Sequence, residues 1–150
     1  MRTVSFEELP SLVGQELGVS DWQLIDQDRI NKFADATGDH QWIHVDVERA
    51  KKEMPGGKTI AHGYLTLSLI PMMGAGIMRV TGVSRGINYG SNKVRFTNMV
   101  PVGSRVRGRQ KLVSAEARPG GIQLTSEFTI EIEGQERPAC IAETIGLVFK

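Results

Sequence analysis

The most apolar part of the chain runs from Thr59 to Met78 and contains no Lys, Arg, Asp or Glu. Its large apolar side chains fall on every side of a helix with 3.6 residues per turn: Leu65, Leu67, Leu69, Ile70, Met72, Met73 and Ile77. A helix without a polar face must be surrounded by protein or by lipid. The stretch reaches membrane-spanning length, but it also holds His62, Pro71 and three glycines, and its flanking charges indicate no orientation. We therefore predict a buried central helix that begins near His62-Gly63 and ends around Gly74 to Gly76.

Two amphipathic helices are predicted before this stretch. Asp26 is a suitable N-cap for the first, which Gly38 ends. The second begins after the N-cap Asp46, exposes charged residues as far as Glu53 and ends at Pro55-Gly56-Gly57. The face of the first helix that we expect to pack inward carries Ile30, Phe33, Ala34 and Thr37.

The pattern after Gly82 changes to the alternation with period two that is typical of strands. The expected strands are Ile87 to Phe96, Ser104 to Val113, Ile122 to Glu133 and Pro138 to Phe149. In the third, Ile122, Leu124, Phe128, Ile130 and Ile132 share one face, and Gln123, Thr125, Glu127, Thr129, Glu131 and Glu133 share the other. Turns are expected at Arg118 to Gly121 and at Glu133 to Glu136.

The beginning of the chain is less regular, with a short helix at Phe6 to Leu12, a loop from Gly14 to Gly18 and a strand near Trp22. One long helix followed by four strands in meander order, with this first strand added, predicts an α+β fold. In it, a curved antiparallel sheet wraps the central helix.

Length and composition narrow the class of protein. The 150 residues suit one domain, residues 1–150. Eighteen basic and seventeen acidic residues give a net charge of +1, which favours neither nucleic acid nor a membrane surface as a partner. The single Cys140 excludes an intrachain disulfide framework and a cysteine-based zinc cluster. The first ten residues contain Glu7 and Glu8 where a signal peptide has its apolar run, so we expect a cytoplasmic protein.

The three histidines of the chain, His40, His44 and His62, all lie near the start of the predicted central helix, together with Asp39 and Asp46. Histidine and aspartate are also ordinary turn and cap residues, which is the structural explanation for each taken alone. Their concentration favours chemistry.

Two kinds of catalytic site fit this concentration poorly. The spacing of His40 and His44 resembles that of a zinc protease helix, but Gln41 occupies the position of the general base, and a third ligand would have to be Asp46 or His62. A serine hydrolase would need an exposed nucleophile, whereas Ser68 lies inside the helical pattern without a G-x-S-x-G motif. We predict no metal and no cofactor.

Acid–base chemistry on a bound water fits better. Asp39 and His44 are five residues apart across a turn and can face one small volume. With reference pKa values of about 3.9 and 6.5, they would be a carboxylate and a mostly neutral imidazole at pH 7. A helix that starts at Gly63 offers unpaired N–H groups to a developing oxyanion, and glycine lets a thioester carbonyl approach closely. Such a site could add water to an activated C=C bond.

Two segments resemble a known family. F-A-D-A-T-G-D-H-Q-W-I-H-V-D at 33 to 46 and I-A-H-G-Y-L-T-L-S at 60 to 68 are similar to the signature of the MaoC-like dehydratases, the R-specific enoyl-CoA hydratases of the hot-dog fold. I-N-Y-G-S-N-K-V-R-F at 87 to 96 and P-V-G-S-R-V at 101 to 106 resemble that family's downstream strand pair. In place of the usual Asn-Pro, this chain has Gln41-Trp42, as in nodulation-protein-N-like members.

The resemblance implies hydration of a trans-2-enoyl thioester of coenzyme A or acyl carrier protein to the (R)-3-hydroxyacyl product. Asp39 and His44 would activate the water, the N–H of Gly63 would bind the thioester oxygen and Ser68 would support the site by hydrogen bonding. His62 would shape the helix start, and Trp42 beside the pair would affect acyl-chain length. The resemblance also implies a homodimer in which two sheets join edge to edge. The row Arg105, Arg107, Arg109 and Lys111 could meet the phosphates of coenzyme A, as could Lys93 and Arg95, but a row of like charges on an outer strand face is usually just solvated. Two alternatives remain, an acyl-CoA thioesterase and a non-catalytic acyl-binding module on the same fold.

Overall fold

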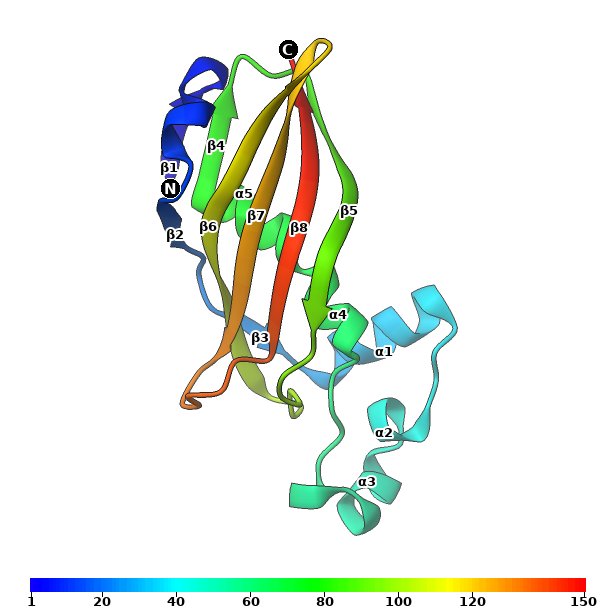
Figure 1. Cartoon of the computed structure of the whole chain (residues 1–150). Coiled ribbons are helices and arrows are strands. Elements are labelled where there is room, and N and C mark those ends of the chain that lie inside the picture. Colours follow the sequence, from blue (N-terminus) through cyan, green and yellow to red (C-terminus); the bar gives the residue numbers. More distant parts are fainter.

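The computed structural model describes residues 1–150, and its main feature is a curved antiparallel sheet of long strands. Four of them lie side by side (Figure 1): β6 (Ser104–Arg118), β7 (Gly121–Ile132), β8 (Cys140–Phe149) and β5 (Arg85–Arg95). Two short strands, β2 (Glu16–Val19) and β3 (Gln23–Ile25), both pair with β6 and complete the sheet. The α+β hot-dog arrangement predicted from the sequence is confirmed.

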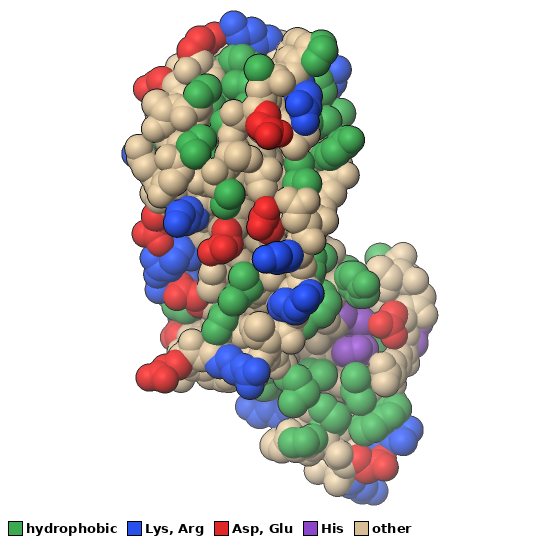
Figure 2. Space-filling view, in the orientation of Figure 1, with side chains coloured by type: hydrophobic (Ala, Val, Ile, Leu, Met, Phe, Trp, Pro, Cys, Tyr) green, Lys and Arg blue, Asp and Glu red, His purple; other side chains and the backbone are tan.

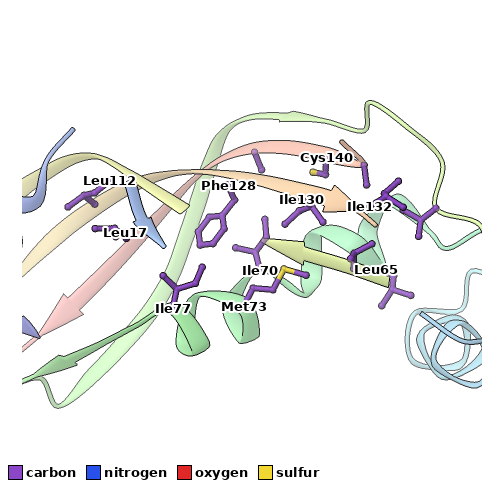
Figure 3. Close-up of a cluster of buried hydrophobic side chains, with 14 of the residues drawn as sticks. Leu17, Leu65, Ile70, Met73, Ile77, Leu112, Phe128, Ile130, Ile132 and Cys140 are labelled. Carbon is purple, nitrogen blue, oxygen red and sulfur yellow. The ribbon is translucent and has the colours of Figure 1, made fainter. Parts of the chain in front are cut away.

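The central apolar stretch lies against one face of this sheet as two helices, α4 (Gly63–Ser68) and α5 (Ile70–Ile77). Figure 3 shows Ile70, Met73 and Ile77 of α5 directed toward Phe128 and Ile130 of β7. These side chains belong to one buried apolar cluster, which also includes Leu65, Val106, Leu112, Ile132 and Cys140. Burial of such side chains stabilises the fold by about 1.5–3 kcal/mol each.

The prediction of a single central helix without a solvent face is wrong in two respects. The helix is interrupted at Leu69, because Pro71 has no N–H to donate to the carbonyl of Leu67 and its ring crowds that carbonyl. It also has a solvent face, since the exposed side chains recur at helical spacing along one side: Tyr64, Ser68, Pro71, Met72 and Ala75. No helix in the structure combines the length and the apolar character that crossing a membrane requires.

The helices before α4 extend beyond the end of the sheet where β3 lies (Figure 1). They are α1 (Gln27–Thr37), α2 (Trp42–Val45) and α3 (Val47–Glu53), followed by the 3-10 turn η2 (Pro55–Gly57). Both predicted caps are confirmed: Asp26 accepts from the N–H of Arg29, and Asp46 accepts from the N–H of Arg49. Gly38 ends α1 in the left-handed conformation, with φ 83°. Thr37 is exposed, contrary to the prediction, and its hydroxyl donates to the carbonyl of Phe33.

The strand order differs from the predicted meander. β5 pairs with β8 and not with β6, so the sheet runs β2-β6-β7-β8-β5. The connection between β5 and β6 crosses beneath the end of the sheet, where Pro101 bridges to Ile60. Alternation identifies a strand but not its neighbour, which explains the error.

Smaller differences concern the ends of the chain and one strand face. The 3-10 helix η1 (Phe6–Leu12) matches the predicted short helix, but β1 (Arg2–Ser5), β2 and β4 (Met78–Thr81) were not predicted. β1 and β4 form a separate parallel pair. Thr125, assigned to the solvent face of β7, is buried, and it lies next to the point where the pairing of β6 with β7 shifts register between Leu112 and Ser114.

Candidate functional site

Two buried imidazoles form the centre of the site. The short helix α2 carries His44, and His62 occupies the N-cap position of α4. Their rings are stacked, with centroids 3.8 Å apart and planes inclined by 24°. His44 is 6% exposed and His62 is 3% exposed. Figure 2 shows histidine side chains at the junction between the sheet and the helices α1 to α3.

One nitrogen of each ring is held by a backbone carbonyl. His44 Nδ1 lies 2.7 Å from the carbonyl oxygen of Ile60, and His62 Nε2 lies 3.0 Å from the carbonyl oxygen of Asp39. Because a carbonyl only accepts, both of these nitrogens carry the proton and donate. In the neutral rings, the lone pairs are therefore at His44 Nε2 and His62 Nδ1. His62 Nδ1 is buried and has no protein hydrogen-bond partner.

Asp39 completes the group from the loop after α1. Its exposed carboxylate accepts from the N–H of Gln41 at 3.3 Å. One carboxylate oxygen and one nitrogen from each of His44 and His62 all lie within 4.8 Å of one another. The predicted proximity of Asp39 and His44 is confirmed. His62 links them, because it stacks on one ring and binds the backbone of the other residue.

The surroundings keep His44 neutral. Burial is the largest influence and lowers the pKa of His44 below its ordinary value of 6.5. The hydrogen bond to Ile60 and the charge of Asp39 act in the opposite direction, and His62 adds to the lowering. At pH 7 the ring therefore offers an acceptor at Nε2.

A cavity of about 400 Å³ opens beside His44. Gly63, the first residue of α4, also lines it, and the N–H of Gly63 donates to no protein group. A Cβ at position 63 would lie 3.0 Å from the ring of Phe96, so a larger residue would require that ring to move. The cavity therefore has an imidazole acceptor and a free backbone donor in one wall. Its other lining residues are Ile60, Ala61, Thr66, Phe96, Thr97, Asn98, Met99, Val100, Arg137 and Ala139.

The two histidines with the spacing of a zinc protease helix, His40 and His44, do not come together in one site. His40 is exposed and bonds to Asp35 at 2.9 Å, which raises the pKa of His40. Asp46 serves as the N-cap of α3. The ligand atoms that do come together belong to Asp39, His44 and His62.

The remaining candidates lie around this group and not inside it. Ser68, at the end of α4, donates to the carbonyl of Tyr64 and lines a different cavity. Trp42 lines neither cavity, and its ring is covered by the guanidinium of Arg49 at 4.0 Å. Gln41 is exposed and contributes its backbone N–H to Asp39. Substrate-binding roles for Ser68, Trp42 and Gln41 stay predictions.

Sequence reasoning missed Gln27, which holds the backbone of the site. Its amide donates to the carbonyl of His44 at 2.7 Å and accepts from the hydroxyl of Thr59 at 2.5 Å. It thus ties the start of α1 to α2 and to the segment before α4. These partners are 17 and 32 residues away in the chain, and no local pattern indicates such contacts.

The row of basic residues on β6 is largely neutralised. Arg105 pairs with Glu133, Arg107 with Glu131, and Arg109 with Glu16 and Glu131. The guanidinium of Arg107 also lies 4.4 Å from the ring of Trp22. Phosphate binding by this row stays a prediction.

Comparison with known proteins agrees with this geometry. The family model described as MaoC like domain matches residues 8–129. The chain is 52% identical over 147 residues to 3-hydroxyacyl-thioester dehydratase Z of Mycobacterium tuberculosis, covering 97% of both chains. It is 47% identical over 150 residues to nodulation protein N of Rhizobium leguminosarum bv. viciae, covering 99% of this chain and 93% of that one.

Solved structures share the fold. An (R)-hydratase from A. caviae involved in PHA biosynthesis superposes with a TM-score of 0.71 at 22% identity, over 89% of this chain and 94% of that one. A monoamine oxidase regulatory protein from Archaeoglobus fulgius superposes with a TM-score of 0.78 at 24% identity, over 100% and 97%. With the match to the family model over most of its length, the chain belongs to the MaoC-like dehydratase family.

Proposed function

We propose that the protein is a hydratase that reversibly adds water to a trans-2-enoyl thioester and forms the (R)-3-hydroxyacyl thioester. The observation that carries the proposal is one arrangement of three groups. The Asp39 carboxylate and the neutral His44 imidazole lie within 4.8 Å of each other, and the free N–H of Gly63 lines the cavity that His44 also lines. The name of the mycobacterial relative, 3-hydroxyacyl-thioester dehydratase Z, supports the same substrate class.

In this mechanism, the water is held between the Asp39 carboxylate and Nε2 of His44. Nε2 takes a proton from the water while the water oxygen bonds to C3 of the enoyl group. The electron pair of the C2=C3 bond moves toward the thioester, whose oxygen gains negative charge. The imidazolium then returns its proton to C2 and becomes neutral again. Imidazole suits the role of base because its reference pKa of about 6.5 exceeds the carboxylate value of about 3.9.

The N–H of Gly63 supports the enolate oxygen. A donor placed in advance, away from bulk water, stabilises developing charge without reorganising during the reaction. Thr66 lines this cavity, and Leu67 and Ser68 line the other, so both cavities lie along α4. A substrate held at Gly63 would direct its acyl chain along the helix.

Three basic residues near the cavity could bind the phosphates of the group that carries the acyl chain. Lys93 and Arg95 lie near the end of β5, Arg137 lines the cavity, and none of them forms an ion pair. Figure 2 shows basic side chains on this face beside the histidines. We infer that the phosphates of coenzyme A, or of the phosphopantetheine arm of a carrier protein, bind there.

The test is hydration of trans-2-enoyl-CoA substrates of several chain lengths, followed by loss of enoyl absorbance. Asp39→Asn and His44→Gln should each lower kcat by about 10²- to 10⁴-fold, the usual contribution of general acid–base groups. His40→Gln is the matched control, because His40 is exposed and bound to Asp35. It should retain normal activity.

Other outcomes would contradict the proposal. Near-normal rates in both variants would remove Asp39 and His44 from the mechanism. Release of free thiol from saturated acyl-CoA, without change in enoyl absorbance, would indicate a thioesterase. Binding of acyl-CoA without turnover by the wild-type protein would indicate a non-catalytic module.

A further inference from the structure

A second cavity, of about 550 Å³, lies between the helices and the open edge of the sheet. Its apolar walls come from α4, α5 and β7, with Leu67, Ile70 and Phe128 among them. Figure 3 shows Ile70 and Phe128 between α5 and the sheet. A simple alkyl chain would need nothing more than such walls, because apolar burial is not directional. The floor of this cavity is different.

Gln110 and Ser126 form a hydrogen-bonded polar pair in that floor. Gln110 is 9% exposed, and its amide nitrogen donates to the hydroxyl oxygen of Ser126 at 3.0 Å. Gln110 Oε1 is buried and has no protein partner. The hydroxyl of Ser126 donates to no protein group. Both residues line the cavity, so its floor contains one enclosed, unpaired acceptor and one unpaired donor.

Two features direct this pair toward the cavity. A Cβ at Gly74 would lie 3.9 Å from Gln110 Oε1, so α5 approaches that enclosed oxygen with no side chain between them. Thr144 on β8 pairs with Ser126 on one side and with Ser91 on the other. Thr144 and Ser91 also line the cavity, and their side chains make no hydrogen bond to protein. The polar floor thus continues across four strands.

An unpaired buried acceptor destabilises a protein, and such groups are rare without a ligand or a function. A hydroxyl group matches this pair, because it can donate to Gln110 Oε1 and accept from Ser126. We propose that the larger cavity receives an acyl chain carrying a hydroxyl group distal to the reacting carbons, and that Gln110 is the residue that selects it. This inference rests on the proposed thioester hydration, and it names the substrate class.

The experiment compares matched enoyl-CoA substrates that differ only in a distal hydroxyl, placed from mid-chain to the terminal carbon. The wild-type enzyme should prefer one hydroxylated series by about 10- to 100-fold in kcat/KM, since the alkyl chain leaves Gln110 Oε1 unpaired. Gln110→Leu keeps a similar volume and should reduce that preference to near one while retaining the rate on the alkyl substrate. Gln123→Leu is the control, because Gln123 contacts Glu116 and Arg118 and does not line the cavity.

Calorimetric binding of saturated acyl-CoA pairs, with and without the hydroxyl, makes the result independent of turnover. A hydroxyl preference that Gln110→Leu abolishes supports the inference even if no hydration occurs, in which case only the proposed reaction is wrong. Equal binding and equal kcat/KM for both series would overturn it and indicate that solvent alone occupies the floor. An equal loss on both substrates in Gln110→Leu would likewise overturn it and assign Gln110 a structural role.

Discussion

At the scale of single residues, burial decides the protonation of His44. The loss of hydration lowers the pKa of His44, so the folded protein binds a proton there less readily than the unfolded chain. The free energy of unfolding should therefore fall as the pH drops from 6.5 toward the folded-state pKa. His40 acts with the opposite sign, because Asp35 raises its pKa and its contribution is lost as the pH rises through that value.

The same shift predicts the pH dependence of hydration. If neutral His44 is the base, kcat/KM should rise with pH along a limb whose midpoint lies below 6.5, since kcat/KM reports the free enzyme. The measurement is kcat/KM from pH 4.5 to 8, in wild type and in His40→Gln. This variant removes the exposed histidine, so that its titration does not contribute to the profile. A midpoint above 6.5 in both proteins would contradict this assignment.

Replacing His62 tests how the pair is held together. His62→Phe keeps an aromatic ring beside His44 but removes the N–H that binds the Asp39 carbonyl. Displacement of Asp39 should lower kcat by about 10²-fold. The variant also removes a group that lowers the pKa of His44. The acidic limb of the kcat/KM profile should therefore move to higher pH. A reduced rate with an unchanged limb would assign His62 only a packing role.

At the scale of elements, the proposed mechanism requires the start of α4 to remain without a side chain, so that the thioester can approach the N–H of Gly63. Gly63→Ala would bring a Cβ to 3.0 Å from the Phe96 ring, and that ring, which lines the cavity, must then shift. We expect kcat/KM to fall by about 10²-fold, because small displacements in a reacting geometry have effects of that size. The control is Gly76→Ala in α5, where a Cβ would have no neighbour within 4 Å. Unchanged kinetics for Gly63→Ala would exclude this amide from the mechanism.

The elements also show which features the sequence could predict. Caps at Asp26 and Asp46 and the glycine at position 38 act locally, so the bounds of α1 and α3 followed from the residues themselves. The pairing of β5 with β8 did not, because it depends on contacts far apart in the chain. The proximity of Asp39 and His44 could be predicted for the same reason as the caps, since both residues lie in one short segment. The supporting contacts of Gln27 and the hydrogen bond between Gln110 and Ser126 could not be predicted, because the partner residues come from distant elements.

At the scale of the whole molecule, strand β5 leaves one edge of the sheet unpaired. It is an 11-residue edge strand paired only with β8, and its side chains are exposed along almost all of its length. Tyr89 is 65% exposed and Ile87 is 47% exposed. A long free edge with apolar side chains normally pairs or is covered. Since Tyr89 and Ser91 also line the larger cavity, a second copy joined at β5 would close the acyl-chain site.

This geometry predicts a two-fold homodimer that a charge at the middle of β5 disrupts. An antiparallel pair of identical strands places residues near the strand centre beside their own copies, so Tyr89→Glu would set two like charges close together. We expect light scattering to show a dimer for the wild type and a monomer for Tyr89→Glu, with circular dichroism confirming that the monomer is folded. Val113→Glu is the control, because Val113 is 41% exposed but lies on β6, away from this edge. A wild-type monomer, or a dimer that both variants retain, would mean that β5 is not the interface and that the cavity remains open at this edge.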